Sequence, residues 1–124
     1  MPHFLLVMFG GAIGAGLRHA VGQAALARLG PGFPWGTLFV NLAGGLLIGL
    51  LAGWLVRGGG SEGARLFLTV GVLGGFTTFS AFSLEMGNMI QRGDLGVAAL
   101  YATASVAGSI LLLFAGLWLM RAAA

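Results

Sequence analysis

Four apolar segments follow one another along the chain, and each is long enough to cross a lipid bilayer. They cover residues 4–29, 36–56, 65–90 and 95–120. A spanning helix needs about 20 predominantly apolar residues. The connections between the segments are too short to hold a soluble domain. The sequence therefore predicts one all-α membrane domain over residues 1–124, with four transmembrane helices.

The scarcity of charged residues supports this prediction. Only 7% of the 124 residues are charged and 58% are hydrophobic, whereas a soluble domain carries about 25% charged residues. Such a chain cannot cover a surface that faces water, so we expect the lipid bilayer to surround it. The isoelectric point of about 11.3 comes from scattered arginines rather than a basic stripe, which argues against a nucleic-acid partner.

The N-terminal segment indicates where the protein resides. It lacks the Lys/Arg start of a signal peptide, and its apolar stretch continues into the rest of the chain. We therefore expect it to be retained as the first membrane helix. Because no targeting segment is recognisable, we expect a multi-pass protein of a plasma membrane, such as a bacterial inner membrane.

The third segment contains a run of residues that a membrane helix normally avoids. Residues 74–83 read GGFTTFSAFS and lie near the middle of the segment. Adjacent glycines and adjacent threonines weaken a regular helix. A broken backbone at membrane depth is tolerated only where protein, water or an ion satisfies its peptide groups. We therefore predict that the third helix is broken at the bilayer midplane and that the break faces a functional site.

Small residues recur at helical spacing in the first two segments. Gly10 and Gly14 form a pair that lets another helix approach closely. The second segment carries a stripe with a period of four residues, formed by Thr37, Asn41, Gly45, Gly49 and Gly53. A neighbouring backbone can lie against this stripe. Asn41 has two interpretations: it joins helices through hydrogen bonds, or it donates a neutral hydrogen bond into a polar path.

Other polar residues in the apolar segments also allow two interpretations. Arg18 either snorkels to the membrane surface or lies at the mouth of an anion path. Glu85 is a functional candidate as a carboxylate in a membrane segment, or it lies near enough to the helix end to reach water. Tyr101, Ser105 and Ser109 share one face of the fourth segment. Their hydroxyls form a polar ladder, or they bond to carbonyls of their own helix.

The arginines are balanced between the two ends of the predicted helices. Arg57, Arg65 and Arg121 lie at one end, and an equal number, Arg18, Arg28 and Arg92, lie at the other. Because arginine bias sets orientation, this chain has no preference and is predicted to insert both ways. Two opposite copies could then pair as an antiparallel homodimer, with their broken helices in contact. Free carbonyl oxygens at that contact would suit a hard cation such as Na⁺, held as a structural ion.

A path lined by neutral donors would favour an anion. Asn41 and Ser or Thr hydroxyls can replace hydration water, and the positive edge of a phenyl ring adds a weak attraction. Phe79 and Phe82 are three residues apart and share a helix face. The ordinary interpretation of such a pair is packing.

Three motifs resemble those of one known family, the Fluc (CrcB) fluoride channels. They are residues 74–82 (GGFTTFSAF), 36–44 (GTLFVNLAG) and 10–18 (GGAIGAGLR), and they occur in order along the whole chain. The sequence departs from the family pattern at Ala81, where many relatives carry threonine, and at Gly16.

The resemblance implies an antiparallel, dual-topology homodimer with two pores. It also implies a central Na⁺ held by the backbone carbonyls of Gly74 and Thr77 from both subunits. Arg18 and Glu85 match positions near the pore mouths. The residues expected to line the pore are Asn41, Thr78, Phe79, Ser80, Phe82, Ser83, Tyr101, Ser105 and Ser109.

The function implied by the resemblance is passive export of cytoplasmic fluoride. HF crosses membranes as a neutral acid and dissociates inside, and a pore lets the inside-negative potential drive the anion out. Two other functions compete with this one. A small dual-topology multidrug exporter would need a carboxylate in the middle of a helix, whereas Glu85 is off-centre. A non-transporting scaffold subunit would explain the glycines but not the predicted break. An enzyme is not expected, because no nucleophile–base pair is recognisable.

Overall fold

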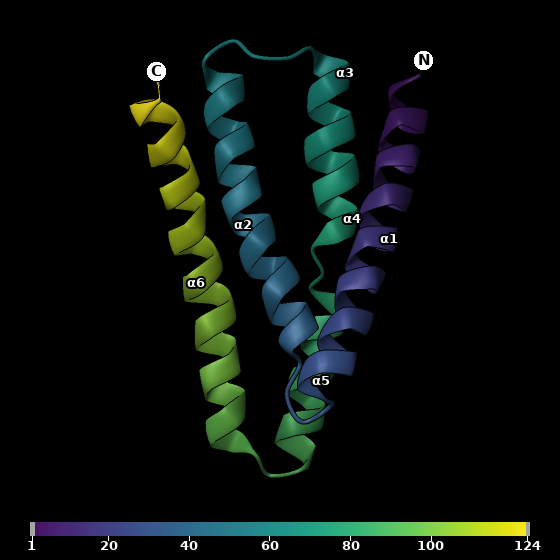
Figure 1. Ribbon diagram of the computed structural model, residues 1–124, viewed down its shortest axis with the longest axis vertical. Helices are drawn as coiled ribbons and strands as arrows, with labels where there is room; N and C mark the ends of the chain where they lie inside the picture. The colour runs from purple at the N-terminus through teal and green to yellow at the C-terminus, as the bar shows by residue number, and fades with distance from the viewer. Residues whose placement is uncertain (1, 124) are drawn as a thin grey trace.

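The computed structural model describes residues 2–123 and contains four long apolar spans (Figure 1). Three are continuous helices: α1 (His3–Leu29), α2 (Trp35–Val56) and α6 (Leu95–Ala122). The other consists of successive pieces: α3 (Glu62–Arg65), the π-helix η1 (Leu66–Leu73), α4 (Gly74–Phe76) and α5 (Ser80–Gln91). The prediction of an all-helical membrane protein with four long apolar helices is confirmed.

The spans run up and down, with short connections at both ends. Both ends of the described chain lie beside the connection between α2 and α3, and the α1–α2 and α5–α6 connections lie at the opposite end (Figure 1). The α5–α6 turn contains Gly93 at φ 82°, a backbone conformation that glycine adopts without steric cost. The main packing partners are not neighbours in sequence: α1 packs mainly on η1 and α4, and α2 packs mainly on α6.

Glycines allow α1 to lie directly against the backbone of the third span. Gly10 and Gly14 are the buried residues of α1. A Cβ atom added to Gly10 would lie 2.5 Å from the carbonyl oxygen of Phe67, and one added to Gly14 would lie 2.7 Å from the amide nitrogen of Phe76. The predicted close approach at Gly10 and Gly14 is therefore confirmed, and its partner is the third span.

The glycine stripe of α2 faces α6. A Cβ atom added to Gly45 would lie 2.6 Å from the carbonyl oxygen of Ser109, and one added to Gly53 would lie 2.6 Å from Cβ of Met120. At Gly49 the added atom would meet the carbonyl oxygen of Leu113. The expectation that a neighbouring backbone lies against this stripe is confirmed.

The third span changes its hydrogen-bonding pattern twice. In η1 the bonds are those of a π-helix, and at its end the N–H of Gly74 donates to the carbonyl of Thr69, five residues earlier. After α4, Thr77 is extended, with ψ 158°, and helical structure resumes at Ser80 (Figure 1). π-helical turns are rare and occur frequently at functional sites. The sequence patterns did not indicate the π-helix.

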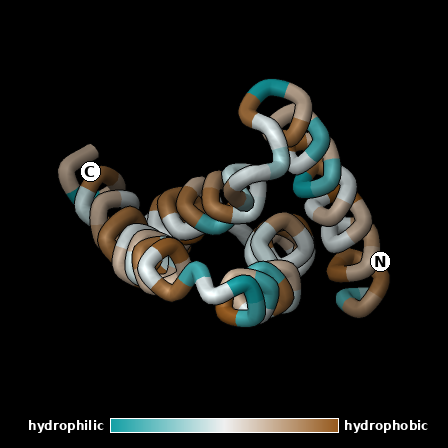
Figure 2. The backbone as a smooth tube through the Cα atoms, turned by 90° about the horizontal axis from the view of Figure 1, so that it is seen from below, coloured by the Kyte–Doolittle hydropathy of each residue, from teal (hydrophilic) through white to brown (hydrophobic). Residues whose placement is uncertain are grey.

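Most large apolar side chains lie on the outside of the molecule. The buried hydrophobic residues described are few: Val40, Leu73, Phe76, Phe82, Met89, Ala98 and Tyr101. In the view along the helices, hydrophobic positions occupy the outward faces of the spans (Figure 2). These faces need lipid or another apolar surface around them, because in water they would be strongly unfavourable.

Replacing Gly14 with alanine is expected to destabilise the protein by about 1–3 kcal/mol, because the added methyl group forces α1 away from α4. Gly11→Ala is the matched control, since an added Cβ there meets nothing within 4 Å. Thermal unfolding of both variants in detergent would measure the difference. Equal stability of the two variants would contradict the close packing described here.

Candidate functional site

A groove opens between α2, the third span and α6, with a cavity volume of about 570 Å³. We call it the central groove. It brings together eight residues that the sequence singled out: Asn41, Gly74, Thr77, Thr78, Phe79, Phe82, Ser105 and Ser109. Among the residues described, none of those lining it is charged. The groove is therefore an uncharged and mostly apolar surface, in which hydroxyls, an amide and backbone groups lie among aliphatic side chains and aromatic rings.

Asn41 is paired with the non-helical stretch of the third span. Its Nδ2 donates to the carbonyl oxygen of Thr78 at 2.9 Å, and the N–H of Thr78 donates to Oδ1 of Asn41 at 2.9 Å. The side-chain amide of Asn41 thus satisfies both the N–H and the carbonyl of Thr78, as the backbone of a regular helix would. The structure places Asn41 both at the groove and in an interhelical contact, and its contact with an ion stays a prediction.

This pairing changes which carbonyls are available. In an uninterrupted helix the N–H of Thr78 would reach the carbonyl of Gly74, four residues earlier, but it donates to Asn41 instead. The N–H of Ala81 would likewise reach Thr77, but it donates to Oγ1 of Thr78 at 3.2 Å. The carbonyls of Gly74 and Thr77 therefore lack their helical donors, and both residues line the central groove.

Arg18 supports the same stretch from the other side. Its Nε donates to the carbonyl oxygen of Gly75 at 3.1 Å, and the residue is half-buried. It lines a separate small pocket of about 160 Å³ together with Thr37 and Thr78. The guanidinium of Arg18 thus supplies a donor to the carbonyl of Gly75 where the helix is interrupted. The position of Arg18 at a pore mouth stays a prediction.

The polar residues of α6 bond to other helices. The hydroxyl of Tyr101 donates to Oε1 of Glu85 at 2.9 Å, and Oγ of Ser109 donates to the carbonyl of Asn41 at 3.2 Å. Ser105 is 6% exposed, and its Oγ has no hydrogen-bond partner among the residues described. An unpaired buried hydroxyl beside a groove is available to a ligand or to water.

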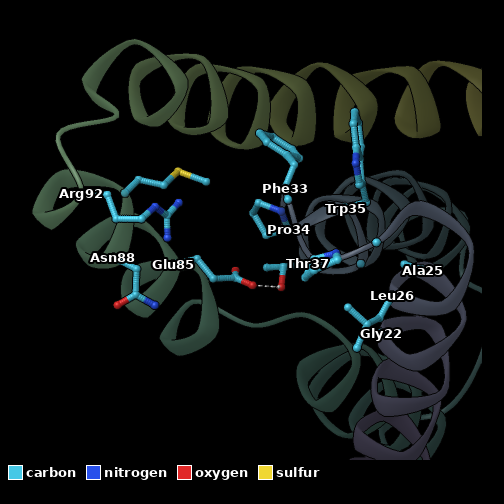
Figure 3. Close-up of a pocket in the computed structure, with 15 residues that line it drawn as sticks. Gly22, Ala25, Leu26, Phe33, Pro34, Trp35, Thr37, Glu85, Asn88 and Arg92 are labelled. Atoms are coloured by element: carbon cyan, nitrogen blue, oxygen red, sulfur yellow. Dashed lines mark hydrogen bonds between the residues drawn. The ribbon is translucent and has the colours of Figure 1, made fainter.

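Glu85 accepts two hydroxyl groups. Besides Tyr101, Oγ1 of Thr37 donates to its Oε2 at 3.1 Å (Figure 3). Glu85 and Thr37 line a second cavity of about 330 Å³ beside the α1–α2 connection, which we call the end pocket. The sequence pattern indicated Thr37 only as a member of the α2 stripe. Its position one helical turn before Asn41 is the sequence feature that indicates a polar role.

The aromatic residues form a continuous row. The ring centroids of Phe79 and Phe82 are 5.6 Å apart, and those of Phe82 and Tyr101 are 5.1 Å apart. Phe33 continues the row, 5.4 Å from Tyr101, and Trp35 ends it, 4.6 Å from Phe33. Phe79 is 75% exposed whereas Phe82 is 9% exposed. Phe33 lies in the α1–α2 connection, where no sequence pattern indicated a functional residue.

Three predicted pore residues lie outside both cavities: Ser80, Ser83 and the fully buried Tyr101. Ser80 and Ser83 are exposed and line neither the central groove nor the end pocket. The oxygen of Ser80 lies 3.2 Å from that of Thr78, so it remains close to the interrupted stretch. Their role in a pore stays a prediction.

Comparison with known proteins supplies the family context. Residues 5–117 match the family model described as CrcB-like protein, Camphor Resistance (CrcB). The chain is 58% identical over 123 residues to the fluoride-specific ion channel FluC of Hyphomonas neptunium, covering 98% of this chain and 97% of that protein. It is 59% identical over 116 residues to the protein of the same name from Sphingopyxis alaskensis, covering 93% and 92% of the two chains.

Proposed function

The chain belongs to the CrcB-like protein family, and from this membership we propose that it is a passive, fluoride-selective ion channel and not an enzyme. Its location is the bacterial inner membrane, which its four apolar spans cross. The observation that carries the proposal is the central groove, because its lining offers hydrogen-bond donors and ring edges without a charged side chain among the described residues. The 58% identity to a protein named as a fluoride-specific channel supports it.

The chemistry of the groove suits a small anion that must enter and leave quickly. The hydroxyls of Ser105 and Ser109 and the ring edges of Phe79 and Phe82 can replace part of the hydration shell of fluoride. A fixed cation in the path would hold the ion too tightly, whereas weak polar groups let it leave. The inside-negative membrane potential then drives fluoride out of the cell.

We further propose that two chains of opposite orientation close the groove. The groove is open along one side in a single chain, and Phe79 and Gly74 are exposed there. A second copy would cover these residues and form the other wall of each pore. The equal number of arginines at the two ends supports insertion in both orientations. In such a dimer the interrupted stretch would lie near the bilayer midplane.

Single-cysteine variants test the orientation, because the natural chain has no cysteine. Ser61→Cys lies in the α2–α3 connection and Gln91→Cys lies at the opposite end of the molecule. In intact spheroplasts, a membrane-impermeant maleimide is expected to label roughly half of each variant, as a chain without orientational bias requires. Labelling of only one variant would contradict dual topology.

A structural Na⁺ fits the carbonyls of this stretch. The carbonyls of Gly74 and Thr77 lack their helical donors, because Thr78 and Ala81 donate elsewhere. Oxygen ligands of this type suit a hard cation. We propose that these carbonyls from two subunits would hold Na⁺. The positive charge of the ion would offset the repulsion between four carbonyl oxygens that otherwise face one another.

Ion efflux from liposomes tests the proposed function. Vesicles loaded with KF or KCl and containing the purified protein are diluted into a K⁺-free buffer whose anion is impermeant, and valinomycin provides the path for K⁺. Rapid fluoride release, slow chloride release and no requirement for a proton gradient are expected. Equal release of both anions, or release only with a proton gradient, would contradict a fluoride-selective passive channel.

The two rival functions fit the site less well. A multidrug exporter needs a carboxylate that is free to exchange protons for a cationic substrate, but the carboxylate of Glu85 already accepts bonds from Thr37 and Tyr101. A scaffold subunit would explain the glycine contacts of α1 and α2. It would leave the unpartnered hydroxyl of Ser105 without a purpose.

A further inference from the structure

We propose that Phe33, in the α1–α2 connection, is a positioning residue of the ion path: its ring holds Tyr101 so that the tyrosine hydroxyl stays on Glu85. This inference rests on the proposed channel function. It assigns a role in conduction to a connection that carries none of the three family motifs.

The connection itself fixes the place of Phe33. Pro34 follows it and disfavours the helical region for the preceding residue. The carbonyl of Phe33 accepts the N–H of Trp35 at 2.8 Å. The side chain is half-buried and packs on the cluster formed by Phe82, Met89, Ala98 and Tyr101. Phe33 is thus the residue of the connection that reaches the interior.

The ring of Tyr101 is held by two aromatic neighbours. Phe82 contacts it at a centroid distance of 5.1 Å with an interplanar angle of 45°, and Phe33 contacts it at 5.4 Å in an edge-on arrangement of 80°. Edge-to-face pairs are favourable beyond the area that they bury. Tyr101 has no exposed surface, and these two contacts hold its ring in the orientation in which its hydroxyl reaches Glu85.

This fixed hydroxyl lies between the two cavities. Phe82 and Ser105 line the central groove, and Glu85 lines the end pocket. Glu85 follows Phe82 by about one helical turn, and Tyr101 precedes Ser105 by about one turn. On the proposed path, an ion that moves between the central groove and the end pocket would pass the contact between Tyr101 and Glu85.

The ring of Phe33 fills the space between the ring of Tyr101 and the end pocket. Phe33 lines the end pocket beside Pro34 and Trp35, and Thr37 and Glu85 line the same pocket (Figure 3). Removing the ring would join its volume to a cavity of about 330 Å³. The ring of Tyr101 could then move into the space that the Phe33 ring had filled, and its hydroxyl would no longer be held on Glu85.

Flux measurements on a double-mutant cycle test this role. Phe33→Ala is expected to lower fluoride efflux by about tenfold, and Tyr101→Phe by a similar factor. If Phe33 acts through the tyrosine hydroxyl, the double variant should be no slower than Tyr101→Phe alone. Phe33→Tyr keeps the ring and should retain nearly natural flux. Losses that multiply in the double variant would overturn the proposal.

A second measurement reports on Tyr101 without any transport. It is the only tyrosine of the chain, so incorporation of 3-fluorotyrosine labels this residue alone for ¹⁹F NMR. Phe33→Ala should shift and broaden the signal, whereas Phe114→Ala should not, because Phe114 is on the same helix but 60% exposed. An unchanged signal in Phe33→Ala would overturn the proposal.

The two measurements separate the possible failures. If the natural protein releases no fluoride while Phe33→Ala still moves the ¹⁹F signal, the channel function is wrong and the contact between Phe33 and Tyr101 is real. If Phe33→Ala does not assemble, Phe33→Leu keeps most of the apolar volume without a ring. It should then show reduced flux and a shifted signal, and natural values of both would overturn the proposal.

Discussion

Asn41→Asp is expected to lower fluoride flux by about 100-fold, a loss equivalent to about 2.7 kcal/mol of barrier height. In the natural protein, Nδ2 of Asn41 donates to the carbonyl oxygen of Thr78 at 2.9 Å. In the variant, an aspartate oxygen would face that carbonyl oxygen instead, so the attraction becomes a repulsion. The same substitution puts a negative charge on the wall of a groove whose described lining is uncharged. Efflux from liposomes measures the change.

Two further variants separate the causes of this loss. Asn41→Ala removes both hydrogen bonds to Thr78 without adding charge, so it should be less harmful than Asn41→Asp. Gln91→Glu is the matched amide-to-acid control, since Gln91 is exposed at the end of α5 and lines neither cavity. If Asn41→Ala and Asn41→Asp lower flux equally, charge on the groove wall does not matter and the anion path lies elsewhere.

Phe82→Ile is expected to lower fluoride flux by about 100-fold while the proposed dimer remains assembled. Phe82 is 9% exposed, lines the central groove and contacts both Phe79 and Tyr101. Isoleucine keeps much of the apolar volume but has no ring edge to attract an anion. Liposome efflux and cross-linking of the dimer, measured on the same preparation, give the two required values.

The matched control for this prediction is Phe114→Ile on the exposed face of α6. It should leave both flux and assembly unchanged. The Phe82 variant also separates a channel from a scaffold, because a scaffold would lose assembly when its packing is disturbed. A Phe82→Ile dimer that conducts at the natural rate would show that the ring only fills space.

The sequence is sufficient to predict the four helices and their close contacts. Long apolar runs specify spanning helices, since a bilayer leaves few alternatives for the backbone. Glycines at a spacing of four residues indicate where another helix can touch, as Gly10 and Gly14 show. The sequence does not reveal which helix makes the contact, because that choice depends on the packing of all four spans.

Contacts that depend on the relative height of two helices could not be predicted from the sequence. The partner of Asn41 is a peptide group 37 residues away, and spacing within one helix says nothing about the height of another. The residues of the π-helix Leu66–Leu73 suit an ordinary helix equally well, and no local pattern marks the place where its Gly71 meets α1. The contact of Phe33 with Tyr101 joins a connection to the last span and leaves no local pattern.

The pairing of distant helices has a consequence for biosynthesis. The principal partner of α1 is the third span, and that of α2 is α6, so neither of the first two helices meets its main partner when it enters the membrane. The residues that contact α1, Gly71 and Phe76, are synthesised later than α1 itself. Those that contact the glycines of α2, Ser109 and Leu113, are synthesised later still. A nascent chain that has not yet reached α6 therefore carries an uncovered glycine face on α2.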